Sequence, residues 1–348
     1  MSTKIEIAGR PVGIGEPCFL IAEVGQAHDG SLGNAHAYID LAAEAKVDAV
    51  KFQTHIAEAE STPAETFRVN FSHQDRTRYD YWRRMEFTPE QWRGLVEHAS
   101  RSGPIFLSSA FSEAAVELLE ELGVPAWKVA SGEISSRPLL EKMAATKKPL
   151  LISTGMATWS DIDQAIGWAR SAGASVALFA CTSEYPCAPQ RWGLNVLGEL
   201  RSRYGCPVGF SDHSGTVAAG LAAAALGANM IEVHITFSRY CFGPDAAASL
   251  TPDELKMLVT GVRQIESALA HPRCIDRNAT ELAETRRLFG KSIVAARDLP
   301  AGHVLSMEDL AFKKPAIGIP AKDYRSVIGT RLRRALSKDT FLSRHDLV

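Results

Sequence analysis

The sequence predicts an α/β fold, a (β/α)8 or TIM barrel followed by a small C-terminal domain. Three observations lead to this prediction. Short apolar runs alternate with helical stretches, eight of each lie between residues 18 and 270, and the alternation stops near Ala270. A strand, a helix and a further strand in succession form a parallel βαβ unit. Eight such units need about 250 residues as a closed barrel, which this region provides.

The expected strands are apolar runs that each lead into polar residues. In chain order they are Cys18–Ala22, Asp48–Val50, Pro104–Leu107, Val124–Trp127, Pro149–Ile152, Ser175–Phe179, Cys206–Phe210 and Met230–Val233. The expected helices are Leu32–Ala45, Pro89–Arg101, Ser112–Leu122, Arg137–Ala145, Trp159–Ala172, Trp192–Tyr204, Val217–Leu226 and Pro252–Leu269. An open doubly wound sheet is the alternative. It would place a Gly-rich dinucleotide motif after the first strand, and residues 25–30 do not match one.

Two histidines follow neighbouring expected strands. His213 ends the run from Cys206, His234 ends the run from Met230, and an Ala-rich helix lies between them. Both imidazoles should therefore project from the same end of adjacent strands, where they could share one divalent metal. The alternative is a pair of core histidines with ordinary hydrogen-bond partners.

Polar residues gather at the same end of the other strands. They are Glu23, Lys51, Gln53, Lys128, Ser131, Glu133, Ser153 and Ser211. Active sites of (β/α)8 barrels lie at the C-terminal ends of the strands. Two ammonium groups among small hydroxyl residues suit a phosphate or a carboxylate. A single lysine at a strand end would more simply be a solvated surface residue.

Composition fits a cytosolic enzyme. The chain has 348 residues and a formal charge of −2, so no charge excess favours nucleic acid as a partner. The apolar runs are strand-sized, so no transmembrane helix is expected. The first residues lack the apolar core of a signal peptide. Six cysteines without CxxC spacing are expected to be free thiols in the cytoplasm.

Two regions depart from the regular alternation. Residues 54–87 form a long connection rich in aromatic residues and arginine, among them Arg68. RNA stacking is one interpretation, but no basic domain surrounds the segment, which favours a packed lid or a subunit contact. The second region begins with an expected linker at 271–280 and a short helix at 281–288. A module of roughly 60 residues follows, which is marginal as an independent domain.

The motifs in this order resemble the sialic acid synthase (N-acetylneuraminate synthase) family over nearly the whole chain. They are Ile21–Gly25, Val50–Gln53, Trp127–Glu133, Ser153–Met156, Cys181–Pro186, Gly209–His213, Glu232–His234, Gly243–Asp245, Leu288–Ser292 and Lys313–Pro315. The resemblance implies a barrel in residues 1–270, a linker and short helix in 271–289, and an antifreeze-like (SAF) domain in 290–348. It also implies a homodimer in which the tail of one chain covers the barrel of its partner.

The activity implied by the resemblance is a carbon–carbon bond-forming transfer. Phosphoenolpyruvate would condense with an open-chain N-acylated sugar, giving a nine-carbon 2-keto acid and phosphate. By analogy His213 and His234 bind Mn²⁺, with Mg²⁺ or Co²⁺ as alternatives. The phosphoenolpyruvate positions are Lys51, Lys128, Ser131, Ser153 and Ser211. The positions near the reacting centre are Glu23, Gln53 and Glu133, and the sugar positions are Ser183, Tyr185, Asp245 and Lys314.

Three departures from the family pattern concern the acceptor sugar. The usual Asn-His-x-Gly begins with Ala27, the usual Asn of a Cys-Thr-Asn segment is Ser183, and the tail arginine is Lys314. Lys replaces a planar fork with a point charge. Together the three departures suggest an acceptor other than plain N-acetylmannosamine. One alternative is a 2,4-diacetamido-6-deoxy hexose, which would give a legionaminic- or pseudaminic-type acid, and another is a different sugar acid in a surface polysaccharide pathway. Two alternatives remain, a Schiff-base aldolase using Lys128 and a non-catalytic sugar-binding protein.

Overall fold

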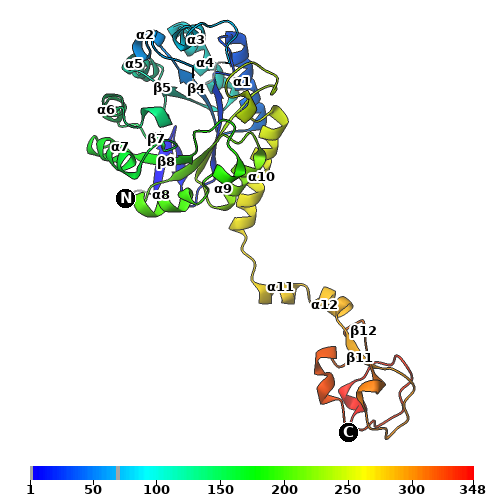
Figure 1. The fold of residues 1–348 in the computed structure, drawn as a ribbon. Helices are drawn as coiled ribbons and strands as arrows, with labels where there is room; N and C mark the ends of the chain where they lie inside the picture. Colours follow the sequence, from blue (N-terminus) through cyan, green and yellow to red (C-terminus); the bar gives the residue numbers. More distant parts are fainter. Residues whose placement is uncertain (1–2, 68–70) are drawn as a thin grey trace. The chain divides into compact units, whose positions relative to one another are not determined.

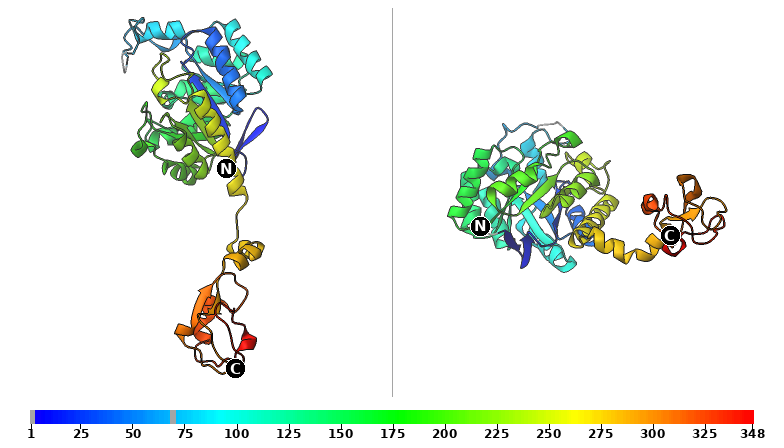
Figure 2. Two further views of the ribbon diagram at one scale, coloured as in Figure 1. Left: turned by 90° about the vertical axis from the view of Figure 1, so that its right-hand side faces the viewer. Right: turned by 90° about the horizontal axis from the view of Figure 1, so that it is seen from below.

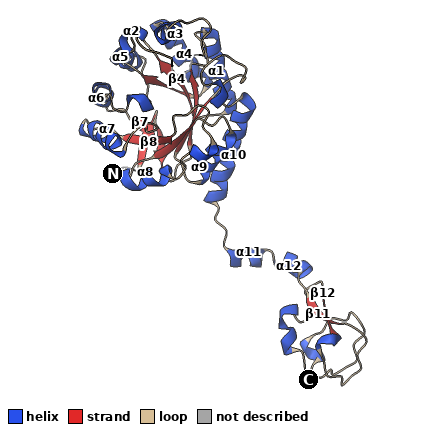
Figure 3. Cartoon of the chain, viewed as in Figure 1, coloured by secondary structure: helices blue, strands red, loops and turns tan. Residues whose placement is uncertain are grey.

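The computed structural model describes residues 3–67 and 71–348, which divide into two compact units, Met1–Ala270 and His271–Val348. The first unit is a closed parallel barrel in the order β10-β3-β4-β5-β6-β7-β8-β9 (Figures 1 and 3). This confirms the predicted fold. The strands are β3 Phe19–Gly25, β4 Ala49–Thr54, β5 Ile105–Ala110, β6 Trp127–Val129, β7 Leu150–Ser153, β8 Val176–Cys181, β9 Val208–Asp212 and β10 Met230–His234.

Helices alternate with these strands and surround the barrel (Figure 3). They are α1 Leu32–Ala45, α4 Pro89–Ser102, α5 Glu113–Glu121, α6 Arg137–Ala145, α7 Trp159–Ser171, α8 Val196–Tyr204, α9 Val217–Ala225 and α10 Pro252–Ala270. Capping boxes at Thr88 and Thr158 satisfy the first free N–H groups of α4 and α7. Helix α8 begins four residues later than predicted because Gly193 has a positive φ of 65°. Within residues 3–67 and 71–348, none of the helices has both the length and the apolar character that crossing a bilayer requires.

The alternation of side chains along each strand separates two apolar cores. On β4, Val50 and Phe52 face the helices, whereas Ala49 belongs to the core inside the barrel. Lys51 and Gln53 share the inward side with Ala49, since side chains two residues apart lie on the same face of a strand. The inward positions therefore change from apolar to polar toward the C-terminal ends of the strands. This change places polar side chains at one end of an otherwise closed core.

An N-terminal hairpin covers the other end of the barrel. It consists of β1 Lys4–Ile7 and β2 Arg10–Gly13, which pair antiparallel. Ile5, Ile7 and Val12 pack against the apolar core inside the barrel. Both views of Figure 2 place this hairpin opposite the segment that follows β4. Its apolar side chains cover the core at the N-terminal ends of the barrel strands.

The long connection after β4 is folded rather than extended. It contains α2 Ala57–Glu60 and α3 Arg78–Met85, and Tyr81, Trp82 and Met85 of α3 form a small apolar cluster with Ala57. Phe67, Phe71 and Tyr79 pack against the same cluster. Arg68, which the sequence places among the basic residues of this segment, lies outside the described residues. The aromatic residues thus serve as packing groups within this segment.

The second unit begins with two short helices, α11 Ile275–Glu281 and α12 Ala283–Phe289. The segment predicted as a linker, 271–280, is thus helical from Ile275 onward. A small sheet of β11 Ser292–Ala295 and β12 Leu310–Lys313 follows. Buried Asp309, just before β12, accepts hydrogen bonds from Ser306, Arg297 and His303.

Buried His28 makes the stability of the barrel depend on pH. The ring lies against Phe87 with centroids 4.8 Å apart, and burial lowers its pKa from 6.5 to about 3. Because the unfolded chain binds this proton more readily, stability is complete above pH 6.5 and falls as the pH decreases toward 3. We expect buried His28 to lower the free energy of unfolding by about 2 kcal/mol at pH 5 relative to pH 7. Urea unfolding of His28→Gln should show a loss smaller by that amount, and an unchanged loss would contradict this assignment.

Candidate active site

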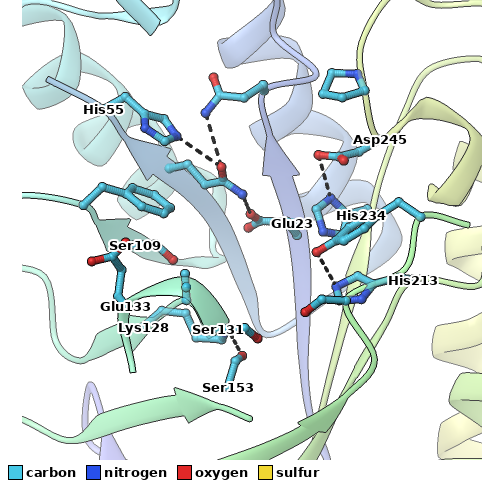
Figure 4. Close-up of a pocket in the computed structure, with 18 of the residues that line it drawn as sticks. Glu23, His55, Ser109, Lys128, Ser131, Glu133, Ser153, His213, His234 and Asp245 are labelled. Carbon is cyan, nitrogen blue, oxygen red and sulfur yellow. Dashed lines mark hydrogen bonds and ion pairs between the residues drawn. The ribbon is translucent and has the colours of Figure 1, made fainter. Parts of the chain in front are cut away.

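A cavity of about 620 Å³ opens at the C-terminal ends of the barrel strands (Figure 4). All the sequence-predicted site residues of the barrel line it, from Glu23 of β3 to His234 of β10. They are Glu23, Lys51, Gln53, Lys128, Ser131, Glu133, Ser153, Ser183, Tyr185, Ser211, His213, His234 and Asp245. Lys314 belongs to the second unit, where its ammonium group lies 5.1 Å from the ring centroid of Phe289. The structure thus brings thirteen predicted residues to one cavity.

Two lysines and two carboxylates form the floor of the cavity. The Lys51 ammonium lies 2.7 Å from Glu23 and 3.8 Å from Glu232, and the Lys128 ammonium lies 3.3 Å from Glu232. All four side chains are at most 4% exposed. Buried charges are tolerated when they are paired. The four formal charges balance, so an arriving anion meets donors that are already held in place.

The lysines and carboxylates of the cavity floor shift one another's pKa values. Burial alone would lower the pKa of Lys51, but the carboxylates of Glu23 and Glu232 outweigh it and raise that pKa. Burial lowers the pKa of Lys128, which Glu232 offsets only in part. Burial would raise the pKa of Glu232, but Lys128 and Lys51 lower it to about 2. Glu232 therefore stays ionised between the two lysines.

Hydroxyl groups surround these lysines. Lys51 donates to Ser109 Oγ at 3.3 Å, and Lys128 donates to Ser153 Oγ at 2.7 Å. Ser211 donates to Glu232 at 3.3 Å. Ser131 Oγ accepts from the backbone N–H of Gly155 at 3.2 Å. A Cβ at position 155 would lie 2.5 Å from Ser183 Oγ, so glycine is required for this close approach. The combination of ammonium and hydroxyl donors is suited to a phosphate or carboxylate.

His213 and His234 lie together at the side of the cavity opposite Lys128, with ring centroids 5.4 Å apart (Figure 4). Nδ1 of His213 donates to the Thr182 carbonyl at 2.8 Å, so its Nε2 carries a lone pair and accepts from the Tyr185 hydroxyl at 3.0 Å. Burial and the neighbouring His234 lower the pKa of His213 to about 3. Asp245 approaches His234 Nδ1 to 3.7 Å.

A divalent metal fits this pair of donors. Metal-binding imidazoles are neutral, and a backbone carbonyl commonly fixes the tautomer of the ring, as Thr182 does for His213. In the part of the chain that the structure describes, no group of three or more His, Cys, Asp or Glu side chains has an arrangement that could hold a metal. His213 and His234 are the two residues that would hold an ion here.

Among the cavity residues that the sequence analysis did not assign to the site are Glu232 and His55. Glu232 lies two residues before His234 on β10, so both face the barrel interior. His55 lies two residues after Gln53 and contacts its carboxamide at 3.3 Å. The two-residue alternation along β10 could have indicated Glu232, whereas His55 lies beyond the end of β4. Glu133 does line the cavity, and burial together with Glu60 raises its pKa.

Comparisons with known proteins identify the family of this chain. Residues 38–273 match the NeuB family and residues 290–348 match the SAF domain. The chain is 36% identical to human N-acetylneuraminate-9-phosphate synthase, over 97% of this chain and 95% of the relative. It is 34% identical to N,N'-diacetyllegionaminic acid synthase of Campylobacter jejuni, over 93% and 98%.

A solved structure extends the likeness to three dimensions. The N-acetylneuraminic acid synthetase of Leptospira borgpetersenii, in complex with citrate, superimposes with a TM-score of 0.72 at 31% identity, over 82% of this chain and 97% of that one. The barrel, the SAF domain and the full-length relatives lead to one assignment. The chain belongs to the NeuB family, the phosphoenolpyruvate-dependent sialic acid synthases that its sequence resembles, and it is an enzyme of that transferase class.

Proposed function

We propose that this enzyme condenses phosphoenolpyruvate with an open-chain N-acylated hexosamine, releasing phosphate and a nonulosonic acid. The observation that carries the proposal is the arrangement of the cavity. Buried Lys51 and Lys128 with their serine partners stand on one side, and the His213–His234 pair stands on the other. An anionic donor and a carbonyl acceptor can therefore be held at the same time, which favours bond formation between them.

In the proposed reaction Lys51, Lys128, Ser131, Ser153 and Ser211 hold the phosphate and carboxylate of phosphoenolpyruvate. Its methylene carbon attacks the aldehyde carbon, water adds at C2, and phosphate leaves. The lysines stay beside the phosphate throughout, so their charge stabilises the tetrahedral intermediate. Glu133, with its raised pKa, is suited to accept a proton from the water that adds at C2. Glu23 and Gln53 border the same space.

His213 and His234 would hold a divalent ion, which we propose to be Mn²⁺. A bound ion at that position polarises the aldehyde oxygen as a Lewis acid. The neutral, carbonyl-anchored imidazole of His213 supports this assignment. Tyr185 and Asp245, which contact the two histidines, would then meet the sugar beside the ion.

For the acceptor we propose a 2,4-diacetamido-6-deoxy hexose or a related amino sugar rather than plain N-acetylmannosamine. The aromatic residues Phe67, Phe71, Tyr81 and Trp82 line one wall of the cavity. Such a wall suits methyl groups of a deoxy sugar and of acetamido substituents. Phosphate release with a panel of N-acyl hexosamines and phosphoenolpyruvate tests the proposal. Faster turnover of N-acetylmannosamine than of every diacetamido sugar would refute this acceptor.

A Schiff-base aldolase is the second candidate, because burial lowers the pKa of Lys128 and so favours its nucleophilic amine form. Reduction with borohydride in the presence of a 2-keto acid separates the two reactions. The condensation leaves Lys128 unmodified, whereas the aldolase reaction adds the reduced substrate to it, as mass spectrometry would detect.

We further propose a cytoplasmic homodimer in which the second unit of one chain covers the cavity of its partner. Charge supports this arrangement. Residues 271–348 carry 15 Lys and Arg against 9 Asp and Glu, which leaves 23 against 31 in residues 1–270. A basic tail and an acidic barrel attract one another. Lys314 would then reach the N-acyl group of the sugar.

Mixing two inactive variants tests the exchange of tails. We expect His213→Ala and Lys314→Ala to be severely impaired alone. In a mixed dimer with tails acting in trans, one site carries both changes and the other carries neither. Activity should therefore return to about half of wild type per dimer. If the tail acts on its own barrel, each site carries one change, and a mixed dimer as inactive as its parents would contradict the exchange.

A further inference from the structure

His55 is a buried residue of the cavity wall to which the proposed reaction gives no role. It follows β4, and only 4% of its surface is exposed. Its imidazole lies between two nearly parallel rings. The Trp82 ring of α3 is 3.9 Å away at an angle of 13°, and the Phe111 ring after β5 is 4.3 Å away at 15°. The two stacked rings fix the plane of the imidazole. Figure 4 shows His55 with the hydrogen bond from its ring drawn as a dashed line.

The partners of His55 determine whether each of its ring nitrogens donates or accepts a hydrogen bond. Nδ1 lies 2.5 Å from a carboxylate oxygen of Glu60, and Nε2 lies 3.3 Å from the carboxamide oxygen of Gln53. The Gln53 amide nitrogen donates to Glu23 at 2.8 Å, which turns the amide oxygen toward His55. Since that oxygen only accepts, Nε2 carries a proton and donates to it.

These contacts form a continuous chain from the segment after β4 to the cavity floor. It runs from Glu60 through His55 and Gln53 to Glu23, whose other oxygen pairs with Lys51 at 2.7 Å. An amide group can rotate by half a turn at little cost in packing, and its orientation is set by its partners. Without the Nε2 donor, only Gln26, at 3.4 Å, would remain for the Gln53 oxygen among the described side chains.

We propose that His55 is a positioning residue, which holds the Gln53 carboxamide in the orientation that keeps Glu23 hydrogen-bonded and directed at Lys51. This inference rests on the proposed condensation and adds a residue to it. Because Trp82 forms one side of the stack, the packing of α3 also fixes the ring. His55 acts through Gln53 and needs no contact with either substrate.

Two amide replacements separate this role from mere packing. The side-chain nitrogen of His55→Gln reaches the place of Nε2 and still donates to Gln53, whereas the shorter His55→Asn leaves Gln53 without that donor. We expect His55→Gln to keep kcat within about threefold of wild type and His55→Asn to lower kcat about 10- to 30-fold. KM for phosphoenolpyruvate should change by less than about twofold, since its lysines and serines remain. Equal losses in both variants would overturn the proposal.

A double-mutant comparison tests whether the effect passes through Gln53. In a Gln53→Ala background, His55→Asn should cause no further loss of kcat, because the group that it positions is absent. A further loss of about 10-fold or more in that background would show an independent role and overturn the proposal.

A spectroscopic measurement tests whether His55 orients the Gln53 amide, independently of turnover. In protein labelled with ¹⁵N-glutamine, the side-chain signals of Gln53 are identified by their loss in Gln53→Ala. They should move in His55→Asn and stay in place in His55→Gln. Wild-type enzyme that releases no phosphate with any N-acyl hexosamine would refute the proposed function, whereas unmoved Gln53 signals in both variants would refute the role of His55.

Discussion

Lys51→Met is expected both to abolish turnover and to destabilise the barrel. The ammonium group lies 2.7 Å from Glu23 and 3.8 Å from Glu232, and all three side chains are buried. Removing it leaves two carboxylates without that cation, and breaking a buried ion pair costs about 3–5 kcal/mol. The enzyme also loses a cation beside the transferred phosphate, which should lower kcat by at least about 10³-fold. Denaturant unfolding and phosphate release measure the two effects.

The double variant Lys51→Met/Glu23→Gln serves as the matched control. It removes the carboxylate that Lys51 neutralises at shortest range, so much of the lost stability should return. Activity should not return, because the phosphate still lacks its cation. If the double variant regained turnover, Lys51 would serve only to hold the fold. If Lys51→Met alone kept turnover, the cavity floor would not be the phosphoenolpyruvate site.

Chelation is the second change with a large expected effect. Treatment with EDTA should abolish phosphate release, and added Mn²⁺ should restore it. His213→Ala and His234→Ala should each weaken Mn²⁺ binding by about 10- to 100-fold or more, because two protein ligands leave little redundancy. Electron paramagnetic resonance of Mn²⁺ reports binding directly, without reference to activity.

The histidine His36 provides a control outside the cavity. It lies on α1 and forms a hydrogen bond with His98 of α4 at 2.8 Å. His36→Ala should therefore leave both Mn²⁺ binding and turnover unchanged. Full turnover in the chelated wild-type protein would rule out a role for the metal. If His213→Ala bound Mn²⁺ as tightly as wild type, His213 would not be a metal ligand.

The barrel could be predicted because its signals are local. The predicted strands are short apolar runs that end in polar residues, and several helices begin with a capping residue, as Thr88 does for α4. The limits of β6 were less predictable, since Pro125 lacks the N–H group that a strand needs. The N-terminal hairpin was missed, although Lys4–Ile7 alternates between polar and apolar residues and Ala8 and Gly9 turn the chain with positive φ.

The site was predictable to the extent that it follows the strands. Lys51, Lys128 and Ser153 sit at strand ends, and a closed barrel brings strand ends together. Glu232 was harder to recognise because it lies inside the strand, where its pairing with Lys51 and Lys128 depends on closure of the barrel. His55 depends on Trp82 and Phe111, which the tertiary fold brings from two other segments. Sequence spacing carries no record of such contacts.

The fate of one oxygen atom tests the central claim most directly. Phosphoenolpyruvate carrying ¹⁸O in the bridge between C2 and phosphorus would be turned over with Mn²⁺ and a diacetamido hexose, and both products analysed by mass spectrometry. Attack of the methylene carbon on the aldehyde, followed by addition of water at C2, breaks the C–O bond. We therefore expect the label to leave with inorganic phosphate. Label retained in the 2-keto acid would mean that the P–O bond breaks, and it would contradict the proposed condensation.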